Sequence, residues 1–305
     1  MTIEQTFTTP ENTHVTAPAV KWGRVVKLMK PITWFGASWA FLCGAIASGA
    51  TEWSFPIAGQ LFLGMLMAGP ILTGFSQVIN DYFDRGVDAI NEPDRPIPSG
   101  DVTLPQVAAM TLLLAGAGMA ISRFFGIGVF LLASCGFILA VFYSAPPTRA
   151  KRNGWVGNGM VAISYEGLAW LAGHLVFAAL TPGSVMIALL YSFGTHGIMS
   201  INDYKSIEGD RQSGINTIPV LLGEQHAAWL ITGFMNLAQI GVIALFVAWD
   251  MYIITAILVV LLLAQLPGQR GFLKDPAENY LKFSAIGVNF FVWGMMVAAI
   301  GLRMM

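Results

Sequence analysis

Residues 57–88, IAGQLFLGMLMAGPILTGFSQVINDYFDRGVD, decide the fold. The segment 57–80 contains no charged side chain, and Asp81, Asp84 and Asp88 follow it directly. A helix that spans a membrane needs about 20 mostly apolar residues. The stretch therefore predicts a transmembrane helix that delivers several carboxylates to one membrane surface.

The same apolar pattern recurs along nearly the whole chain. Of its 305 residues, 55% are hydrophobic and 11% are charged, whereas an average soluble domain carries about 25% charged residues. The apolar segments lie at residues 34–50, 57–80, 104–122, 125–144, 158–180, 183–200, 226–248, 251–266 and 284–302. They predict an all-α polytopic membrane protein with nine transmembrane helices, the eighth ending before Pro267. Residues 1–20 are polar and are expected to form a disordered tail before one domain, residues 21–305.

The charges predict the orientation of these helices. If the N-terminus is cytoplasmic, the nine spans place every Lys and Arg on the cytoplasmic side except Arg123 and Arg303. Cytoplasmic loops carry such an excess of cations, so we expect a cytoplasmic N-terminus. The acidic clusters fall on the same side, which predicts that the chemistry takes place at the cytoplasmic face. The net charge of −1 argues against a nucleic-acid-binding protein, which needs a basic surface.

The first acidic motif is Asn80-Asp81-Tyr82-Phe83-Asp84-Arg85-Gly86-Val87-Asp88. If the helix continues, Asn80, Asp84 and Asp88 lie one turn apart on one face, with Asp81 beside them. Like charges at this spacing repel one another, so the arrangement calls for a cation. Ligands that offer only oxygen favour Mg²⁺ over zinc. The competing interpretation is that these acids are solvated loop charges.

The second acidic motif follows the sixth span, at Asn202-Asp203-Tyr204-Lys205-Ser206-Ile207-Glu208-Gly209-Asp210-Arg211. Asp203 and Asp210 are expected to share one helical face. Glu208 lies off that face, so its role as a ligand requires the helix to loosen near Gly209. Two acidic patches that face each other suit a diphosphate bridged by Mg²⁺.

Basic side chains are expected to complete a diphosphate pocket. For each of them, the competing interpretation is an anchor at the inner membrane surface, which we favour for Arg152, Arg270 and Lys274. The candidates for diphosphate contact are Lys30, Arg85, Arg95, Lys151 and Lys205.

At these motifs the sequence resembles the UbiA superfamily of intramembrane prenyltransferases. The first motif matches the superfamily pattern NDxxDxxxD. The strings at residues 88–100, 143–147, 153–155 and 202–211 resemble its (bacterio)chlorophyll synthase branch, and residues 170–174 and 196–199 resemble the bacteriochlorophyll-specific members. The resemblance implies nine helices around a central cavity, with the acidic motifs at its cytoplasmic mouth. It also implies that Mg²⁺ and the diphosphate are held by Asn80, Asp81, Asp84, Asp88, Asp203 and Asp210, with Asp84, Asp88, Asp203 and Asp210 as the catalytic set.

The sequence departs from the superfamily at one position. Ser206 stands where an acid is expected four residues before Asp210. Whether Asp203 or Glu208 compensates as the metal ligand stays open.

The reaction implied by the resemblance joins a C20 tail to a pigment acid. Geranylgeranyl or phytyl diphosphate ionises, and the propionate of bacteriochlorophyllide a attacks C1 and releases diphosphate. A carboxylate is already ionised near neutral pH, so the enzyme needs no strong base. The lipid bilayer surrounds this reaction, in an inner or photosynthetic intracytoplasmic membrane, and pigment-biosynthesis or photosystem-assembly proteins are further candidate partners.

Three rival functions remain. The first is a chlorophyll synthase that acts on chlorophyllide, and the second is a sister enzyme that prenylates 4-hydroxybenzoate, a quinone precursor or haem. The third is a cation-coupled transporter, whose ion site would be expected near the bilayer midplane rather than at one face.

Polar and aromatic residues inside the spans are candidates for contact with the acceptor. An acid within a membrane span is a functional hypothesis by default, and a histidine could ligate the central magnesium of a pigment. The competing interpretation is packing and hydrogen bonding between helices. The candidates are Tyr143, Glu166, Trp170, His174 and His196.

Overall fold

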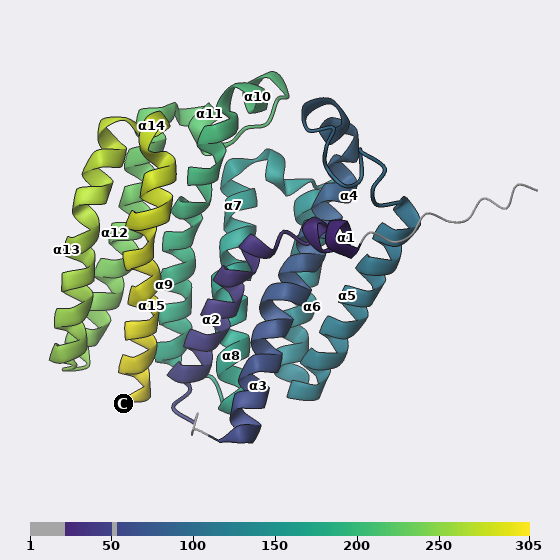
Figure 1. Ribbon diagram of the computed structural model, residues 1–305. Helices are drawn as coiled ribbons and strands as arrows, with labels where there is room; N and C mark the ends of the chain where they lie inside the picture. The colour runs from purple at the N-terminus through teal and green to yellow at the C-terminus, as the bar shows by residue number, and fades with distance from the viewer. Residues whose placement is uncertain (1–21, 51–53) are drawn as a thin grey trace, which may run out of the picture.

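The computed structural model describes residues 22–50 and 54–305. In these two ranges the chain is helical and forms no strand. Figure 1 shows the long helices side by side in one bundle. The all-α fold is thereby confirmed, while the predicted tail at residues 1–20 lies outside the described residues.

The helices follow the predicted spans closely. Their bounds are α1 Trp22–Leu28, η1 Pro31–Thr33, α2 Trp34–Ala47, α3 Phe55–Leu66, η2 Met67–Thr73, α4 Gly74–Asn91, α5 Leu104–Phe125, α6 Ile127–Ser144, η3 Ala150–Arg152, α7 Gly154–Ala162, η4 Ile163–Leu168, α8 Ala169–Phe177, α9 Pro182–Met199, η5 Ser200–Ser206, α10 Ile207–Gln212, α11 Ile218–Leu222, α12 Glu224–Ala248, α13 Tyr252–Lys274, α14 Pro276–Lys282, η6 Phe283–Gly287 and α15 Val288–Arg303.

In the described part of the chain, eight continuous helical runs are long and apolar enough to cross a membrane. They correspond to the second to ninth predicted spans. The first predicted span, 34–50, is a shorter apolar helix, Pro31–Ala47. The structure thus supports eight of the nine predicted spans by length, and the first only as this shorter helix.

Helix α2 packs tightly against α8 through two glycines. A Cβ atom on Gly44 would lie 1.9 Å from the carbonyl oxygen of Trp170, and one on Gly173 would lie 2.0 Å from that of Phe41. No larger residue fits at either position without moving a backbone. Small residues of this kind let helix backbones approach closely in membranes, and they hold the two helices at the centre of the bundle.

The predicted end of the eighth span at Pro267 is wrong. Helix α13 continues through Pro267 to Lys274. Side chains beyond the proline hold this extension in place: Gln269 exchanges hydrogen bonds of 3.0 and 2.8 Å with Asn236 of α12, and the ring of Phe272 stacks on Phe283 with 4.7 Å between centroids. Neighbouring helices commonly let a membrane helix tolerate proline in this way.

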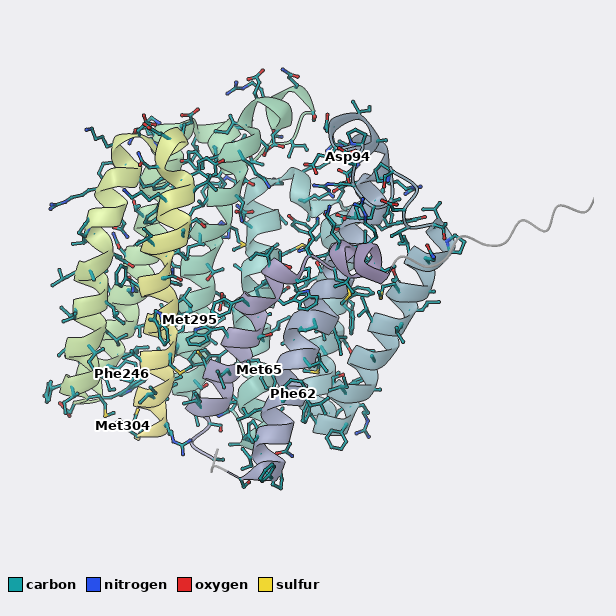
Figure 2. The ribbon with its side chains drawn as sticks, viewed as in Figure 1. Phe62, Met65, Asp94, Phe246, Met295 and Met304 are labelled. Atoms are coloured by element: carbon teal, nitrogen blue, oxygen red, sulfur yellow. The ribbon has the colours of Figure 1, made fainter. Side chains whose placement is uncertain are left out.

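Both acidic motifs lie at the same end of the bundle. Figure 1 shows α10, α11 and α14 at this end, together with the end of α4, and the C-terminus at the opposite end. Figure 2 shows Asp94 near the motif end, and Phe246 and Met304 near the other. We call the end that carries α10 and the last turns of α4 the acidic end.

An apolar cavity opens among the helices. Residues of α2, α4, α6, α7 and α8 line it, together with the two π-helices η2 and η4. A π-helical turn holds an extra residue, and such turns occur frequently at functional sites. The resemblance-based expectation of an internal cavity agrees with this feature.

Candidate active site

Helix α4 carries the first motif as predicted. It runs unbroken from Gly74 to Asn91, so Asn80, Asp84 and Asp88 recur once per turn. The side chains of Asp81 and Asp88 are buried, with 3% and 7% of each residue exposed. Carboxylates buried in this way require charged or hydrogen-bonding partners.

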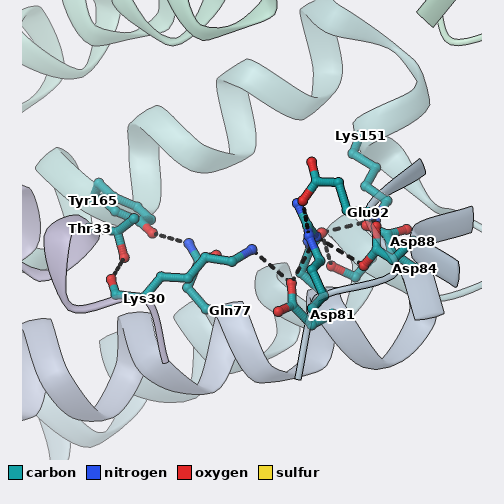
Figure 3. Close-up of polar contacts among 12 residues, drawn as sticks. Lys30, Thr33, Gln77, Asp81, Asp84, Asp88, Glu92, Lys151 and Tyr165 are labelled. Atoms are coloured by element: carbon teal, nitrogen blue, oxygen red, sulfur yellow. Dashed lines mark hydrogen bonds and ion pairs between the residues drawn. The ribbon is translucent and has the colours of Figure 1, made fainter. Parts of the chain in front are cut away.

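Basic residues from two sides supply the partners of Asp81 and Asp88. Lys30 donates to Asp81 at 2.7 Å, and Arg95 donates to Asp88 at 2.9 Å and lies 3.5 Å from Asp81. Arg95 also pairs with Glu92. Figure 3 shows these contacts around Asp81. The structure brings Lys30 and Arg95 to the first motif, and their contact with diphosphate stays a prediction.

Asp84 is held by a second pair of cations, from the segment after α6. Lys151 pairs with Asp84 and donates to the side-chain oxygen of Asn80 at 2.9 Å, and Arg149 donates to Asp84 at 2.9 Å. Burial lowers the pKa of Lys151, and the neighbouring Asp84 carboxylate opposes that shift. The site therefore holds a lysine whose charge is costly to bury and which an additional anion would stabilise.

Sequence reasoning missed Arg149. The residue has a left-handed backbone, with φ of +37°, and Lys30 shares this feature with φ of +46°. Such conformations are uncommon outside glycine and tend to cluster at functional sites. The only available signal in the sequence was the run of cations that follows the two prolines at 146–147.

The second motif differs from the expected continuous α-helix. Residues Ser200–Ser206 form the 3₁₀-helix η5, and the α-helical path resumes only at Ile207 in α10. Asp203 and Asp210 therefore do not share the face of one α-helix, and that expectation is wrong. The tighter winding follows the end of α9, where Asn158 of α7 donates to the hydroxyl of Ser200 at 2.9 Å.

Within this motif Asp203 and Glu208 have different surroundings. The Oδ2 atom of Asp203 is buried, and no described residue hydrogen-bonds to it. Glu208 is exposed, accepts hydrogen bonds from Arg211 at 2.8 Å and from Gln212 at 2.9 Å, and lies in a helix that does not loosen at Gly209. The sequence left open whether Asp203 or Glu208 is the metal ligand. The geometry favours Asp203.

Ser206 occupies the position where an acid was expected. Its hydroxyl donates to Asp210 at 2.8 Å. The serine therefore orients the Asp210 carboxylate instead of adding another negative charge. This contact explains how the second motif can depart from the superfamily pattern and keep Asp210 in place.

Two electrostatic links join the two motifs. Tyr143, at the end of α6, lies within electrostatic reach of both Asp84 and Asp203. A hydrogen bond from Arg95 holds the pKa of Glu92 below its ordinary value, and the positive charge of Lys205 acts in the same direction. Tyr143 and Glu92 therefore each lie close enough to feel charges of both motifs.

Arg85 lies apart from the acids of the first motif. Its guanidinium stacks over the ring of Tyr82, 4.3 Å from the centroid, and donates to the Tyr82 carbonyl at 2.6 Å. Of the predicted diphosphate ligands, Lys30, Arg95 and Lys151 surround the first motif, whereas Arg85 points to Tyr82 and Lys205 is exposed on η5.

Comparison with known proteins decides the family. Residues 29–295 match the UbiA prenyltransferase family. The chain belongs to this family. It is 53% identical to the bacteriochlorophyll synthase 34 kDa chain of Chloroflexus aurantiacus, over 92% of this chain and 90% of that protein. It is 40% identical to the chloroplastic chlorophyll synthase of Arabidopsis thaliana, over 92% and 74%.

The UbiA fold is also seen among solved structures. A UbiA homologue from Archaeoglobus fulgidus bound to GPP and Mg²⁺ superposes with a TM-score of 0.69, at 19% identity, over 90% of this chain and 99% of that one. At this identity the likeness concerns the fold. It confirms the predicted class of intramembrane helical protein.

The acidic end of this UbiA protein is chemically suited to Mg²⁺. Its donors are carboxylate and amide oxygens, and the orphaned Oδ2 of Asp203 offers an unused ligand atom. Within residues 22–50 and 54–305 no three acidic, histidine or cysteine side chains converge closely enough to hold a metal by themselves. Mg²⁺ is commonly bound by one or two carboxylates together with phosphate oxygens and water, so the arrangement fits a metal that arrives with a diphosphate.

Of the predicted acceptor contacts, Tyr143 lines the cavity. Trp170 and His174 are buried away from it and share Ser184, whose hydroxyl lies 2.9 Å from the Trp170 indole nitrogen and 2.9 Å from His174 Nδ1. The other ring nitrogen of His174 contacts the Ala179 carbonyl at 3.0 Å. Packing therefore accounts for both side chains.

Glu166 and His196 also lie outside the cavity lining. Glu166 is buried in η4 within electrostatic reach of Cys43 and Tyr191. The ring of His196 stacks between Trp155 and Phe234, with centroids 5.9 and 5.1 Å away. Their contact with an acceptor stays a prediction.

Sequence reasoning missed Tyr165 and Gln77. Tyr165 lines the cavity, and Gln77 donates to its hydroxyl at 3.3 Å. Figure 3 shows Tyr165 beside Lys30 and Thr33, next to the first motif. The sequence gives no sign of these two residues, because an isolated polar side chain in an apolar span belongs to no recognisable motif.

Proposed function

We propose that the chain transfers a C20 prenyl group from geranylgeranyl or phytyl diphosphate to the propionate of bacteriochlorophyllide a and releases diphosphate. The observation that carries the reaction type is the cluster of α4 carboxylates paired with four cations, with the second acidic motif at the same end of the bundle. The 53% identity to a bacteriochlorophyll synthase supports the acceptor.

The cations of the site bind and orient the donor. Lys30, Arg95, Arg149 and Lys151 lie within contact of the motif acids. A diphosphate placed among them gains charge-assisted hydrogen bonds. Such fixed charges stabilise the negative charge that develops on a departing diphosphate.

Mg²⁺ would be held by Asp84 and Asp88 of α4 and by Asp203 and Asp210 of the second motif, with Asn80 and Asp81 adjoining. When bound, the metal neutralises charge on the leaving diphosphate. Ser206 positions Asp210 through its 2.8 Å hydrogen bond. Lys151 and Lys30 keep the α4 carboxylates fixed by direct pairing.

The cavity excludes water from the reacting carbon. The prenyl group becomes electron-poor at C1 as the C–O bond breaks, and water there would give the free alcohol. The cavity's predominantly apolar lining disfavours water, and it positions the chain so that C1 stays near Tyr143 at the mouth. The acceptor carboxylate is ionised at neutral pH, so no residue of the chain need remove its proton.

A competition assay tests this function. Membranes that contain the protein are given bacteriochlorophyllide a and chlorophyllide a together, with each C20 diphosphate and Mg²⁺, and the ester is identified by mass. We expect the bacteriochlorophyllide ester, and its loss when EDTA removes the metal. A dominant chlorophyllide ester would instead support a chlorophyll synthase, and the absence of any pigment ester would contradict the proposal.

The location of the reaction is also part of the proposal. We place the acidic end at the cytoplasmic face of an inner or intracytoplasmic membrane. The distribution of cations supports this placement, because nearly all of them fall on the side of the two motifs.

A further inference from the structure

The first turns of helix α7 contact the segments that carry both acidic motifs' partners. Gly157 packs on the segment after α6: a Cβ atom at this position would lie 3.0 Å from the Cα of Lys151 and 3.4 Å from the ring of Tyr143. Lys151 in turn pairs with Asp84 of the first motif. This turn of α7 therefore lies against the backbone of a cation that holds the first motif.

The next residue of α7, Asn158, contacts the second motif. Its side chain is buried. The amide nitrogen donates to the hydroxyl of Ser200, the first residue of η5, at 2.9 Å, and Asn158 is also within hydrogen-bonding reach of the Asp203 carboxylate. A carboxamide carries two N–H donors, so one side chain can serve both partners.

The start of α7 is itself held firmly. The side chain of Asn153 caps the helix by accepting hydrogen bonds from the backbone nitrogens of Trp155 and Val156 at 3.0 and 3.1 Å. The backbone nitrogen of Gly154 donates to the carbonyl of Asn216 at 2.8 Å, which ties α7 to the chain that follows α10. The first turns of α7 therefore form a fixed support for the second motif.

The residue after Asp203 is fixed from another side. The hydroxyl of Tyr204 donates to the Glu224 carbonyl at 2.6 Å, and its ring stacks on Tyr280 with 6.1 Å between centroids. The Oδ2 atom of Asp203, by contrast, is buried and has no partner among the described residues. A buried carboxylate oxygen without a partner is unfavourable, and such an atom calls for an explanation in terms of a ligand or a function.

We propose that Asn158 is a positioning residue, which orients Asp203 so that its Oδ2 atom stays available to Mg²⁺. This inference rests on the proposed function, which assigns Asp203 to the metal. Residues that hydrogen-bond to metal ligands fix the direction of those ligands, and their loss typically lowers metal affinity by about 10-fold to 100-fold. Because Gly157 and Asn158 are neighbours on α7, the same helix also sets the spacing between the Lys151–Asp84 pair and Asp203.

Metal binding can be measured without turnover. The purified protein in detergent receives a fixed concentration of inorganic diphosphate, Mg²⁺ is titrated, and Tm is recorded at each concentration. A ligand that binds the folded state raises Tm by mass action. Asn158→Leu keeps a side chain of similar size but removes the donor, and we expect it to raise the Mg²⁺ concentration for half-maximal stabilisation by about 10-fold or more.

A double-mutant cycle distinguishes positioning from packing. If Asn158 acts through Asp203, the double variant Asn158→Leu/Asp203→Asn should need no more Mg²⁺ than Asp203→Asn alone, because the two changes affect one ligand. A residue that only packs α7 against α9 would instead lower the metal-free Tm and leave the half-saturating Mg²⁺ concentration unchanged.

Two serine variants complete the set. Ser192 is buried on α9, and its hydroxyl donates to the Ala188 carbonyl of the same helix at 2.8 Å. Ser192→Ala therefore removes a buried hydroxyl without a contact to the motif and should keep the wild-type Mg²⁺ dependence. Ser200→Ala removes the acceptor that holds the Asn158 amide and should raise the half-saturating Mg²⁺ concentration by about 3-fold. It decides the question if Asn158→Leu does not fold.

The outcomes separate this inference from the proposed function. If Mg²⁺ and diphosphate do not stabilise the wild type, the metal site of the proposed function is wrong. If they stabilise it, and Asn158→Leu and Ser200→Ala both keep the wild-type Mg²⁺ dependence, Asn158 does not position the ligand and the inference is overturned. Independent, additive effects of Asn158→Leu and Asp203→Asn would overturn it as well.

Discussion

Asp84 is the residue around which the first motif is organised. It pairs with both Arg149 and Lys151, and its side chain is largely shielded from solvent. Four cations therefore already surround the acids of α4, counting Lys30 and Arg95. A diphosphate with its metal would enter a site whose charges are fixed in position before binding, which reduces the cost of reorganisation.

Removal of either central carboxylate should abolish product formation. We expect Asp84→Ala or Asp88→Ala to lower kcat/KM by about 1,000-fold or more, because each loses a metal ligand and leaves its cation unpaired. Ester formation is measured by mass under saturating Mg²⁺, and the protein content of the membrane fraction shows that insertion is intact. Near-normal turnover by either variant would remove the metal assignment.

Asp203 and Glu208 provide a matched pair in the second motif. The Oδ2 atom of Asp203 is buried without a partner among the described residues, whereas Glu208 is exposed and paired with Arg211. We expect Asp203→Asn to raise the Mg²⁺ concentration needed for half-maximal activity by about 10-fold or more. Glu208→Gln should leave it unchanged, and the reverse result would reassign the ligand.

Most of the first motif could be predicted from the sequence, because its residues recur at helical spacing on a helix that continues. The cations could be predicted only in part. Lys30, Arg95 and Lys151 lie at the motif, but Arg149 was missed because a loop determines its direction. Arg85 contacts Tyr82 instead of an acid of the motif. Residue spacing does not determine which of these neighbours an arginine contacts.

At the scale of elements, the crossing of α2 and α8 fixes the centre of the bundle. Gly44 and Gly173 place the two backbones in direct contact. The cavity lies beside this crossing, since Ala37 of α2 and Ala172 of α8 both line it. A shift of either helix would therefore change the width of the cavity.

Gly173→Ala should destabilise the protein. The new methyl group would lie 2.0 Å from the Phe41 carbonyl oxygen, and overpacking of this kind costs about 1–3 kcal/mol. Thermal unfolding in detergent, followed by helical circular dichroism, should show a lower Tm. Gly233→Ala on α12 is the control: no described atom lies within 4 Å of its added Cβ, so Tm should stay equal or rise slightly. Equal Tm values for both variants would contradict the close crossing.

The boundaries of most elements could be predicted, because length and hydropathy define a membrane span. Two boundaries could not. Helix α13 passes through Pro267 because Gln269 and Phe272 bind neighbouring helices. The 3₁₀ helix η5 begins at Ser200, which accepts a hydrogen bond from Asn158 of α7, and the local sequence of the second motif gives no sign of such a contact.

At the scale of the whole molecule, the two ends of the bundle differ in charge. The motifs and their cations lie at one end, and the chain terminates at the other (Figure 1). Residues 1–21, including the predicted tail, lie outside the described part, so the side of the N-terminus remains a prediction from the cations. The predicted orientation can be tested by finding on which side of the membrane the C-terminus lies.

Reporter fusions should establish this orientation. Alkaline phosphatase is active only outside the cytoplasm. We expect activity when it follows Met305 and no activity when it is inserted after Ser213, beside α10, because the cations hold the acidic end inside. A green fluorescent protein fusion should give the opposite pattern at both sites. Phosphatase activity at Ser213 would reverse the orientation and place the chemistry outside.

The shortness of the helix at the first predicted span has a consequence for how the donor would arrive. Between Pro31 and Ala47 the chain rises about 24 Å, less than the hydrocarbon thickness of about 30 Å. Helix α1 lies across the bundle below the ends of α4 and α10 (Figure 1). So short a helix favours a locally thinner bilayer or flanking side chains that reach to the interface. A prenyl lipid that diffuses laterally would then meet Lys30 at the depth of its own headgroup, without rising into water.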